Sequence, residues 1–134
     1  MFHAIILGAE QEVVYVEESE KENVKRLEFY QRMLGETVDA ERYPWFRLVM
    51  EINLSEDEVT EVFNLFNILG KQKEELREAG LLDLTPLLLH FVGMLNAKLD
   101  PLITAKSLHH QGHFQELNND LIRLLKKYPS NPME

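Results

Sequence analysis

The sequence contains no cysteine. This absence excludes disulfide bonds, thiolate nucleophiles and cysteine-based zinc or iron–sulfur sites. It also contains no apolar run of the roughly 18–20 residues that a membrane-spanning helix requires. The apolar start at residues 1–7 has no basic residue and is followed by acids, which is a poor secretory signal. We therefore expect a cytoplasmic protein that does not bind a membrane.

Phosphate-binding features are absent as well. The six glycines are scattered singly, so there is no glycine-rich phosphate loop. The formal net charge of −9 argues against binding to a nucleic-acid backbone, because that affinity comes from clustered lysine and arginine. Residues 1–23 hold six acids against one lysine, a net −5, which leaves −4 for the rest of the chain. The sequence therefore predicts no nucleic-acid partner.

The overall composition is that of a globular protein. The chain has 134 residues, of which 45% are hydrophobic and 28% charged, which fits one domain. Ser55 and Glu58 have the spacing of a helix capping box. Prolines mark three further helix starts, because the first helical turn tolerates proline. They are Pro44, Pro86 and Pro101.

The periodicity of apolar residues predicts an all-α fold, a compact multi-helix bundle of about five or six helices behind a short extended N-terminal leader. The expected helices cover about 20–34, 44–53, 56–79, 86–98, 101–111 and 113–128. The helix at 86–98 has few polar residues, so we expect it to be central, with Gly93 on a small face that a neighbouring helix can approach. Residues 71–78 are mostly polar and are expected to lie along the surface.

The chain divides by composition into three segments. Residues 1–23 form an acidic leader, extended or disordered, residues 24–128 the helical domain, and residues 129–134 a frayed tail. The β-prone runs at 5–7 and 13–16 could pair as a hairpin, but two isolated strands are marginal in water. A translation start near Val24 would place the leader outside the native protein, which the intact mass of the protein from its host would test.

A histidine-rich corner is the candidate metal site. His113, Glu116 and Asp120 are spaced to share one helical face, and His109 and His110 lie just before them. Bundle metal sites usually add Glu-x-x-His from a second helix, and that motif does not occur here. The alternative, a solvent-exposed hairpin corner at Gly112, is the one we prefer. No catalytic residue and no cofactor is predicted.

Two further features are interpreted as structural. His90 lies among leucines, which is typical of a neutral, hydrogen-bonded core histidine whose partner the sequence does not identify. An aromatic group is expected in the core, with a ligand pocket or an oligomer interface as the alternatives. Its members are Tyr43, Trp45 and Phe46, with Phe29 and Tyr30 nearby in sequence.

Several short stretches between residues 24 and 128 carry a family resemblance. They are Arg26-Leu27-Glu28-Phe29-Tyr30, Thr37-Val38-Asp39 before Arg42-Tyr43-Pro44, Leu54-Ser55, Phe91 with Gly93, Leu95-Asn96-x-Lys98-Leu99-Asp100, and Gln111-Gly112 with Glu116-Leu117. Over this range the chain resembles the small YhaI-like proteins of Gram-positive spore-forming bacteria. The resemblance implies an all-helical fold and supplies neither an activity nor catalytic residues.

The leading hypothesis is a non-enzymatic interaction module that self-associates or binds another protein. Residues 24–34 and 44–52 carry more large apolar side chains than a small bundle needs for its own core. The expected partner is a second copy, giving a homo-oligomer, or an unidentified protein. The alternative is a small metal-dependent or ligand-binding enzyme that uses the corner at His109, His110 and His113.

Overall fold

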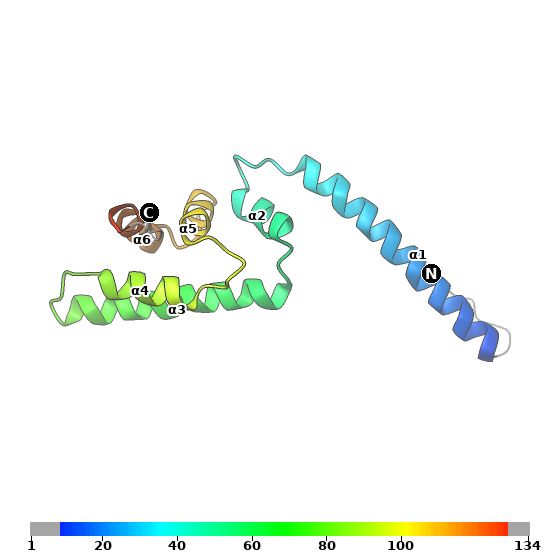
Figure 1. The fold of residues 1–134 in the computed structure, drawn as a ribbon, viewed down its shortest axis with the longest axis horizontal. Coiled ribbons are helices and arrows are strands. Elements are labelled where there is room, and N and C mark those ends of the chain that lie inside the picture. The colour runs from blue at the N-terminus through cyan, green and yellow to red at the C-terminus, as the bar shows by residue number, and fades with distance from the viewer. Residues whose placement is uncertain (1–8, 129–134) are drawn as a thin grey trace. The chain divides into compact units, whose positions relative to one another are not determined.

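The computed structural model describes the backbone of residues 9–128 and the side chains of residues 19–128 (Figure 1). The described residues form six α-helices and no strand, which confirms the predicted all-α fold. The helices are α1 (Ala9–Thr37), α2 (Pro44–Ile52), α3 (Glu56–Glu78), α4 (Thr85–Met94), α5 (Pro101–His110) and α6 (Gln115–Lys127). No helix in this range combines the length and the hydropathy needed to cross a bilayer.

The chain forms two compact units, Met1–Val38 and Asp39–Glu134. In its described part the first unit is α1 alone. This helix begins at Ala9, so it includes the run at 13–16 and much of the segment expected to be extended. Glutamate forms helices readily, and acids near a helix N-terminus interact favourably with the helix dipole. Residues 1–8 and 129–134 lie outside the described residues. The division follows Val38, whereas the composition suggested one after residue 23.

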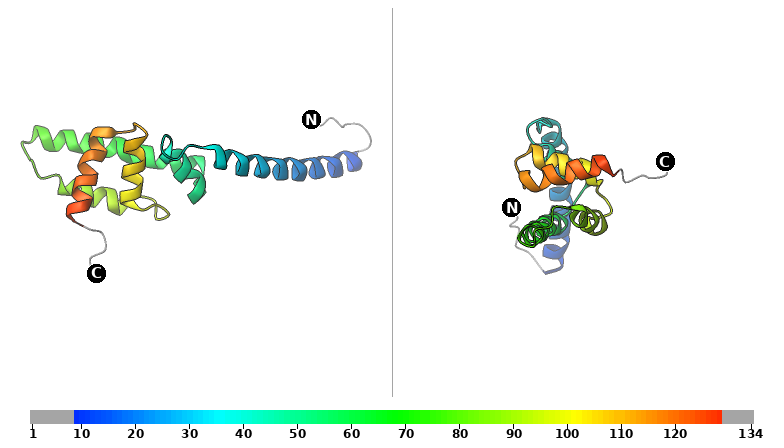
Figure 2. Two further views of the ribbon diagram at one scale, coloured as in Figure 1. Left: turned by 90° about the horizontal axis from the view of Figure 1, so that it is seen from above. Right: turned by 90° about the vertical axis from the view of Figure 1, so that its left-hand side faces the viewer.

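The second unit has two layers. α3 and α4 lie side by side, and the hairpin of α5 and α6 crosses them, while α2 packs against α5 (Figures 1 and 2). Phe66 of α3 is fully buried and packs against Phe91 of α4 and against Phe114, with ring centroids 5.4 and 5.1 Å apart. The core therefore forms where the two layers meet.

Local capping interactions fix two of the helix starts. The backbone N–H of Glu58 donates to Ser55 Oγ at 3.1 Å, and the N–H of Ser55 donates to Glu58 Oε1 at 2.9 Å. This geometry confirms the predicted capping box of α3. In α5, the N–H of Ile103 donates to Asp100 Oδ2 at 2.9 Å. Both caps satisfy first-turn N–H groups that have no partner within their helix.

α2 is capped from a distant part of the chain. Its N-cap residue, Tyr43, makes no capping hydrogen bond through its side chain. Instead the N–H groups of Trp45 and Phe46 donate to Gln111 Oε1, at 2.8 and 3.1 Å. Gln111 directly follows α5, so this one amide oxygen joins the start of α2 to the turn of the α5–α6 hairpin.

The hairpin turn contains two left-handed residues. Gly112 has φ of 93°, and Phe114 has φ of 49°. A left-handed conformation costs a non-glycine residue roughly 1–2 kcal/mol. The ring of Phe114 compensates by packing between Phe63 and Phe66, with centroids 5.4 and 5.1 Å away. The turn is therefore held by tertiary packing as well as by glycine.

Candidate functional site

α1 carries six large apolar side chains that are about half exposed or more. We call this set the α1 stripe; its members are Val24, Leu27, Phe29, Tyr30, Met33 and Leu34. Leu27 is 64% exposed. At about 100° per residue, five of the six lie on one side of the helix, whereas Phe29 lies beside the charged residues Lys25 and Glu36. Among the described residues of its unit, no other element covers the stripe. An amphipathic helix with an uncovered apolar side is typical of a helix that packs against another chain.

The outward side of α4 is a second uncovered apolar surface. Leu89 is 68% exposed and Met94 65%, and the helix contains no charged residue. A Cβ atom built on Gly93 would meet nothing within 4 Å, so no helix of the described chain approaches there. The expectation of a central helix packed on nearly all sides was therefore wrong. α4 lies at the edge of its layer, where it packs mainly against α3 and α6.

His90 links α4 to α3. Its Nδ1 lies 2.8 Å from Gln72 Oε1, and the residue is half-buried. The hydrogen bond expected for this histidine is therefore present, and its partner is an amide on the neighbouring helix. Because a glutamine oxygen only accepts, Nδ1 carries the proton in this arrangement.

The aromatic group is divided between the core and the surface. Trp45 is 1% exposed and packs against Phe63, with ring centroids 6.2 Å apart. Tyr43 and Phe46 are exposed and stack on each other at 5.8 Å. The sequence therefore placed Trp45 correctly in the core, whereas its two neighbours form a small aromatic surface at the start of α2.

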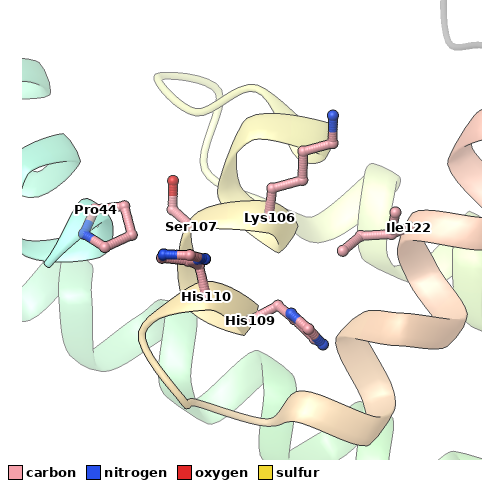
Figure 3. Close-up of a pocket in the computed structure, with 6 residues that line it drawn as sticks. All are labelled: Pro44, Lys106, Ser107, His109, His110 and Ile122. Atoms are coloured by element: carbon pink, nitrogen blue, oxygen red, sulfur yellow. The ribbon is translucent and has the colours of Figure 1, made fainter. Parts of the chain in front are cut away.

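His109 and His110 line a shallow cleft of about 390 Å³. Its other lining residues come from α2, α5 and α6, and they are Pro44, Lys106, Ser107 and Ile122. Figure 3 shows that the two imidazoles diverge, with His110 directed toward Pro44 and His109 toward α6. His113 lies apart from both, because its ring packs edge-on against Phe63 with centroids 5.4 Å apart.

The two carboxylates of the predicted metal site are paired with cations. Lys73 Nζ lies 2.6 Å from Asp120 Oδ2 and 3.3 Å from Glu116 Oε2. Burial lowers the pKa of Lys73, but the bonds to Asp120 and Glu116 outweigh it and raise that pKa above its ordinary value. The Lys73 side chain is only 14% exposed. Residues 71–78 therefore do not all lie along the surface as expected, because Lys73 reaches inward to α6.

The structure thus places the five predicted metal ligands in three environments: the cleft, the ring of Phe63 and the Lys73 ion pairs. In the part of the chain that the structure describes, no group of three or more histidine, aspartate or glutamate side chains could hold a metal ion. The metal site stays a prediction, and metal analysis of the purified protein tests it.

Glu58 forms a polar cluster at the start of α3. Lys98 Nζ lies 2.9 Å from Glu58 Oε2, and Asn96 Nδ2 donates to the same oxygen at 3.3 Å. The hydrogen bond from Lys98, followed by that from the Ser55 N–H, lowers the pKa of Glu58 from 4.5 to about 2. Asn96 and Lys98 thus have a structural role, which ties the segment after α4 to the capping box.

Comparison with known protein families gives a match that spans most of the chain. A family model described as "Protein of unknown function (DUF1878)" matches residues 18–126. This range includes the α1 stripe, all of α2–α5 and nearly all of α6. The chain therefore belongs to the DUF1878 family of proteins of unknown function.

Proposed function

We propose that this protein is a non-enzymatic interaction module that works through the α1 stripe. The exposure of six large apolar side chains on one helix carries the proposal. Fully burying such a side chain contributes about 1.5–3 kcal/mol, so covering the exposed half of the five that share one side contributes roughly 4–8 kcal/mol per helix. That is comparable with the whole stability of a small domain, about 5–15 kcal/mol. A partner that covers the stripe would therefore bind with a substantial driving force.

Two other observations support an interaction module over an enzyme. The outward side of α4 adds a second charge-free apolar surface around Leu89 and Met94. The groups considered for chemistry are used structurally or are spread apart, since Asp120 and Glu116 pair with Lys73. A metal-dependent or ligand-binding enzyme is the alternative hypothesis, and stoichiometric bound metal in the purified protein would favour its metal-dependent form.

Light scattering on the full chain tests the proposal. We expect the wild-type protein to have a mass that is a multiple of 15.7 kDa, and Leu27→Glu to reduce it. Glutamate forms helices almost as well as leucine, so the change removes apolar contact and preserves helix propensity. Lys25→Glu is the matched control, because it adds more negative charge on the polar side of the same helix.

Two outcomes would contradict the proposed self-association. The first is a wild-type protein that stays at 15.7 kDa at high micromolar concentration. The second is an assembly whose mass does not change when Leu27 becomes glutamate. Circular dichroism of each variant shows whether the chain keeps its helix content, so that loss of assembly is distinguished from loss of folding.

We also propose that the chain is one of the YhaI-like proteins of Gram-positive spore-forming bacteria and acts in the cytoplasm. The stretches that carry this resemblance lie within the matched range of 18–126. The absence of cysteine is compatible with a reducing compartment. Fractionation of the native host tests the location, and we expect the protein in the cytoplasmic fraction. Recovery with membranes or in the culture medium would contradict it.

A further inference from the structure

We infer that the cleft lined by α2, α5 and α6 binds a phosphate group, either as a free ion or as part of a small organic molecule. The cleft has a volume of about 390 Å³, which is within the range of small-molecule sites. The inference does not depend on the α1 stripe, so either proposal can fail without the other. It rests on the hydrogen-bond donors of the cleft, on the charge of its lining, and on the apolar residues at its two ends.

The floor of the cleft is formed by the last two turns of α5. Four polar side chains of this helix line it, within an arc of about 160° around the helix axis. They are Lys106, Ser107, His109 and His110. Each of them can donate a hydrogen bond. Within residues 19–128, none of the four side chains has a hydrogen bond or an ion pair, so their donors are available to a ligand.

The arrangement of these side chains favours an anion over a metal ion. His109 and His110 follow Lys106 by three and four residues, which makes both of them its neighbours on the helix surface. The ammonium group of Lys106 attracts an anion and repels a metal cation. The two imidazoles diverge and therefore do not point at one common ion (Figure 3). An anion held by Lys106 lies within reach of either imidazole.

The described lining of the cleft contains no acidic residue, although the chain has 23 acids against 14 lysines and arginines. α5 contains neither aspartate nor glutamate. On α6, Glu116 and Asp120 lie about 120° and 160° around the helix from Ile122, which lines the cleft, and both pair with a lysine of α3. On α2, Glu51 pairs with Arg47 at 3.0 Å. The cleft is therefore locally positive in an acidic protein.

A phosphate group matches these donors better than a carboxylate does. It offers three or four acceptor oxygens and carries up to two negative charges, whereas a carboxylate offers two oxygens and one charge. Hydrogen bonds from a charged donor such as lysine to a phosphate oxygen are among the stronger ones in proteins. Pro44 and Ile122 close the two ends of the cleft with apolar groups, which can cover the apolar part of an organic phosphate.

Titration of the full-length protein with inorganic phosphate tests the inference. The pH and the ionic strength are held constant with sodium chloride, and the NMR signals of the histidine imidazoles are followed. We expect the signals of His109 and His110 to shift and to saturate, with a dissociation constant on the order of 1 mM. The signals of His90 and His113 should stay in place, because these two residues do not line the cleft.

Two lysine variants test whether the cleft itself binds the phosphate. Lys106→Gln should weaken phosphate binding about tenfold, because it removes the charged donor of the cleft. Lys71→Gln is the matched control and should bind as the wild type does. It removes the same charge from an exposed lysine of α3 that does not line the cleft.

Phenyl phosphate distinguishes the two sources of the phosphate group. An affinity several-fold above that of inorganic phosphate would assign the cleft to an organic phosphate, and an equal affinity would assign it to the free ion. Either result upholds a phosphate site. The inference would be overturned by imidazole shifts that sodium chloride alone reproduces, by unchanged binding in Lys106→Gln, or by equal weakening in Lys71→Gln. Acetate that binds as tightly as phosphate would overturn the assignment to phosphate.

Discussion

The side-chain amide of Gln111 caps the start of α2. Its Oε1 accepts from the N–H groups of Trp45 and Phe46, at 2.8 and 3.1 Å, across 66 and 65 residues of sequence. We expect Gln111→Ala to remove both bonds. The two N–H groups belong to the first turn of α2, where the helix has no other side-chain cap.

The expected loss follows from the value of a helix cap. Replacing an N-cap side chain by alanine costs about 0.5–2 kcal/mol, and a typical hydrogen bond contributes about 1 kcal/mol. One bond here is partly buried and the other exposed, so we expect Gln111→Ala to lower the free energy of unfolding by about 1.5 kcal/mol. That is roughly a tenfold change in the ratio of folded to unfolded protein.

Urea unfolding followed by tryptophan fluorescence measures this loss. Trp45 is the only tryptophan of the chain, is 1% exposed, and lies at the cap itself. Its emission therefore reports directly on the release of α2. The urea concentration at the unfolding midpoint should be lower for Gln111→Ala than for the wild type. The dependence of the free energy of unfolding on urea concentration should be unchanged, because the surface exposed on unfolding is nearly the same.

Gln111→Glu is the matched control. Its carboxylate can accept the same two bonds, and a negative charge at a helix N-terminus is favourable, so this variant should be at least as stable as the wild type at neutral pH. The reasoning would be refuted if Gln111→Ala unfolded at the wild-type midpoint, or if the glutamate variant were as unstable as the alanine variant.

Four further measurements follow from the structure. The pKa of Glu58 is about 2 in the folded protein, below its ordinary 4.5, so Glu58 stabilises the fold fully above pH 4.5 and loses this effect as the pH falls toward 2. In Glu58→Gln the free energy of unfolding should therefore depend less on pH between 4.5 and 2. An unchanged pH dependence would contradict this. Lys73→Met should lower the free energy of unfolding by about 2 kcal/mol, because it leaves Asp120 without its closest cation. Adding Asp120→Asn to this variant should recover part of that loss, and urea unfolding of both variants measures it. Gly93→Ala should raise stability by roughly 0.5–1 kcal/mol, because the position is helical and open, and a fall in the thermal midpoint would mean that a Cβ there meets another group. Elemental analysis of tag-free protein should find no stoichiometric metal, since Glu116 and Asp120 pair with Lys73; zinc, iron or manganese that disappears in His113→Ala would overturn that assignment.

The positions of the helices in the second unit could be predicted from the sequence, although α4 ends at Met94 and not near Lys98. Capping signals act over three or four residues, as between Ser55 and Glu58 or between Asp100 and Ile103, so they can be predicted from spacing. The same is true of the amphipathic side of α1 from Val24 to Leu34, because helical periodicity is a local property. The start of α1 was placed too late, because its first half lacks a clear apolar repeat and forms helix through its glutamates.

Tertiary structure decided which of these surfaces became buried and which polar groups met. The cap from Gln111 to Trp45 and the pair of Lys73 with Asp120 join residues that are far apart in sequence, and nothing in the local spacing of either residue indicates its partner. The apolar composition of α4 did not show that Leu89 would be exposed, because burial depends on which elements come to lie beside a helix. Periodicity shows that a helix has an apolar side, but only the packing of other elements decides whether that side is covered.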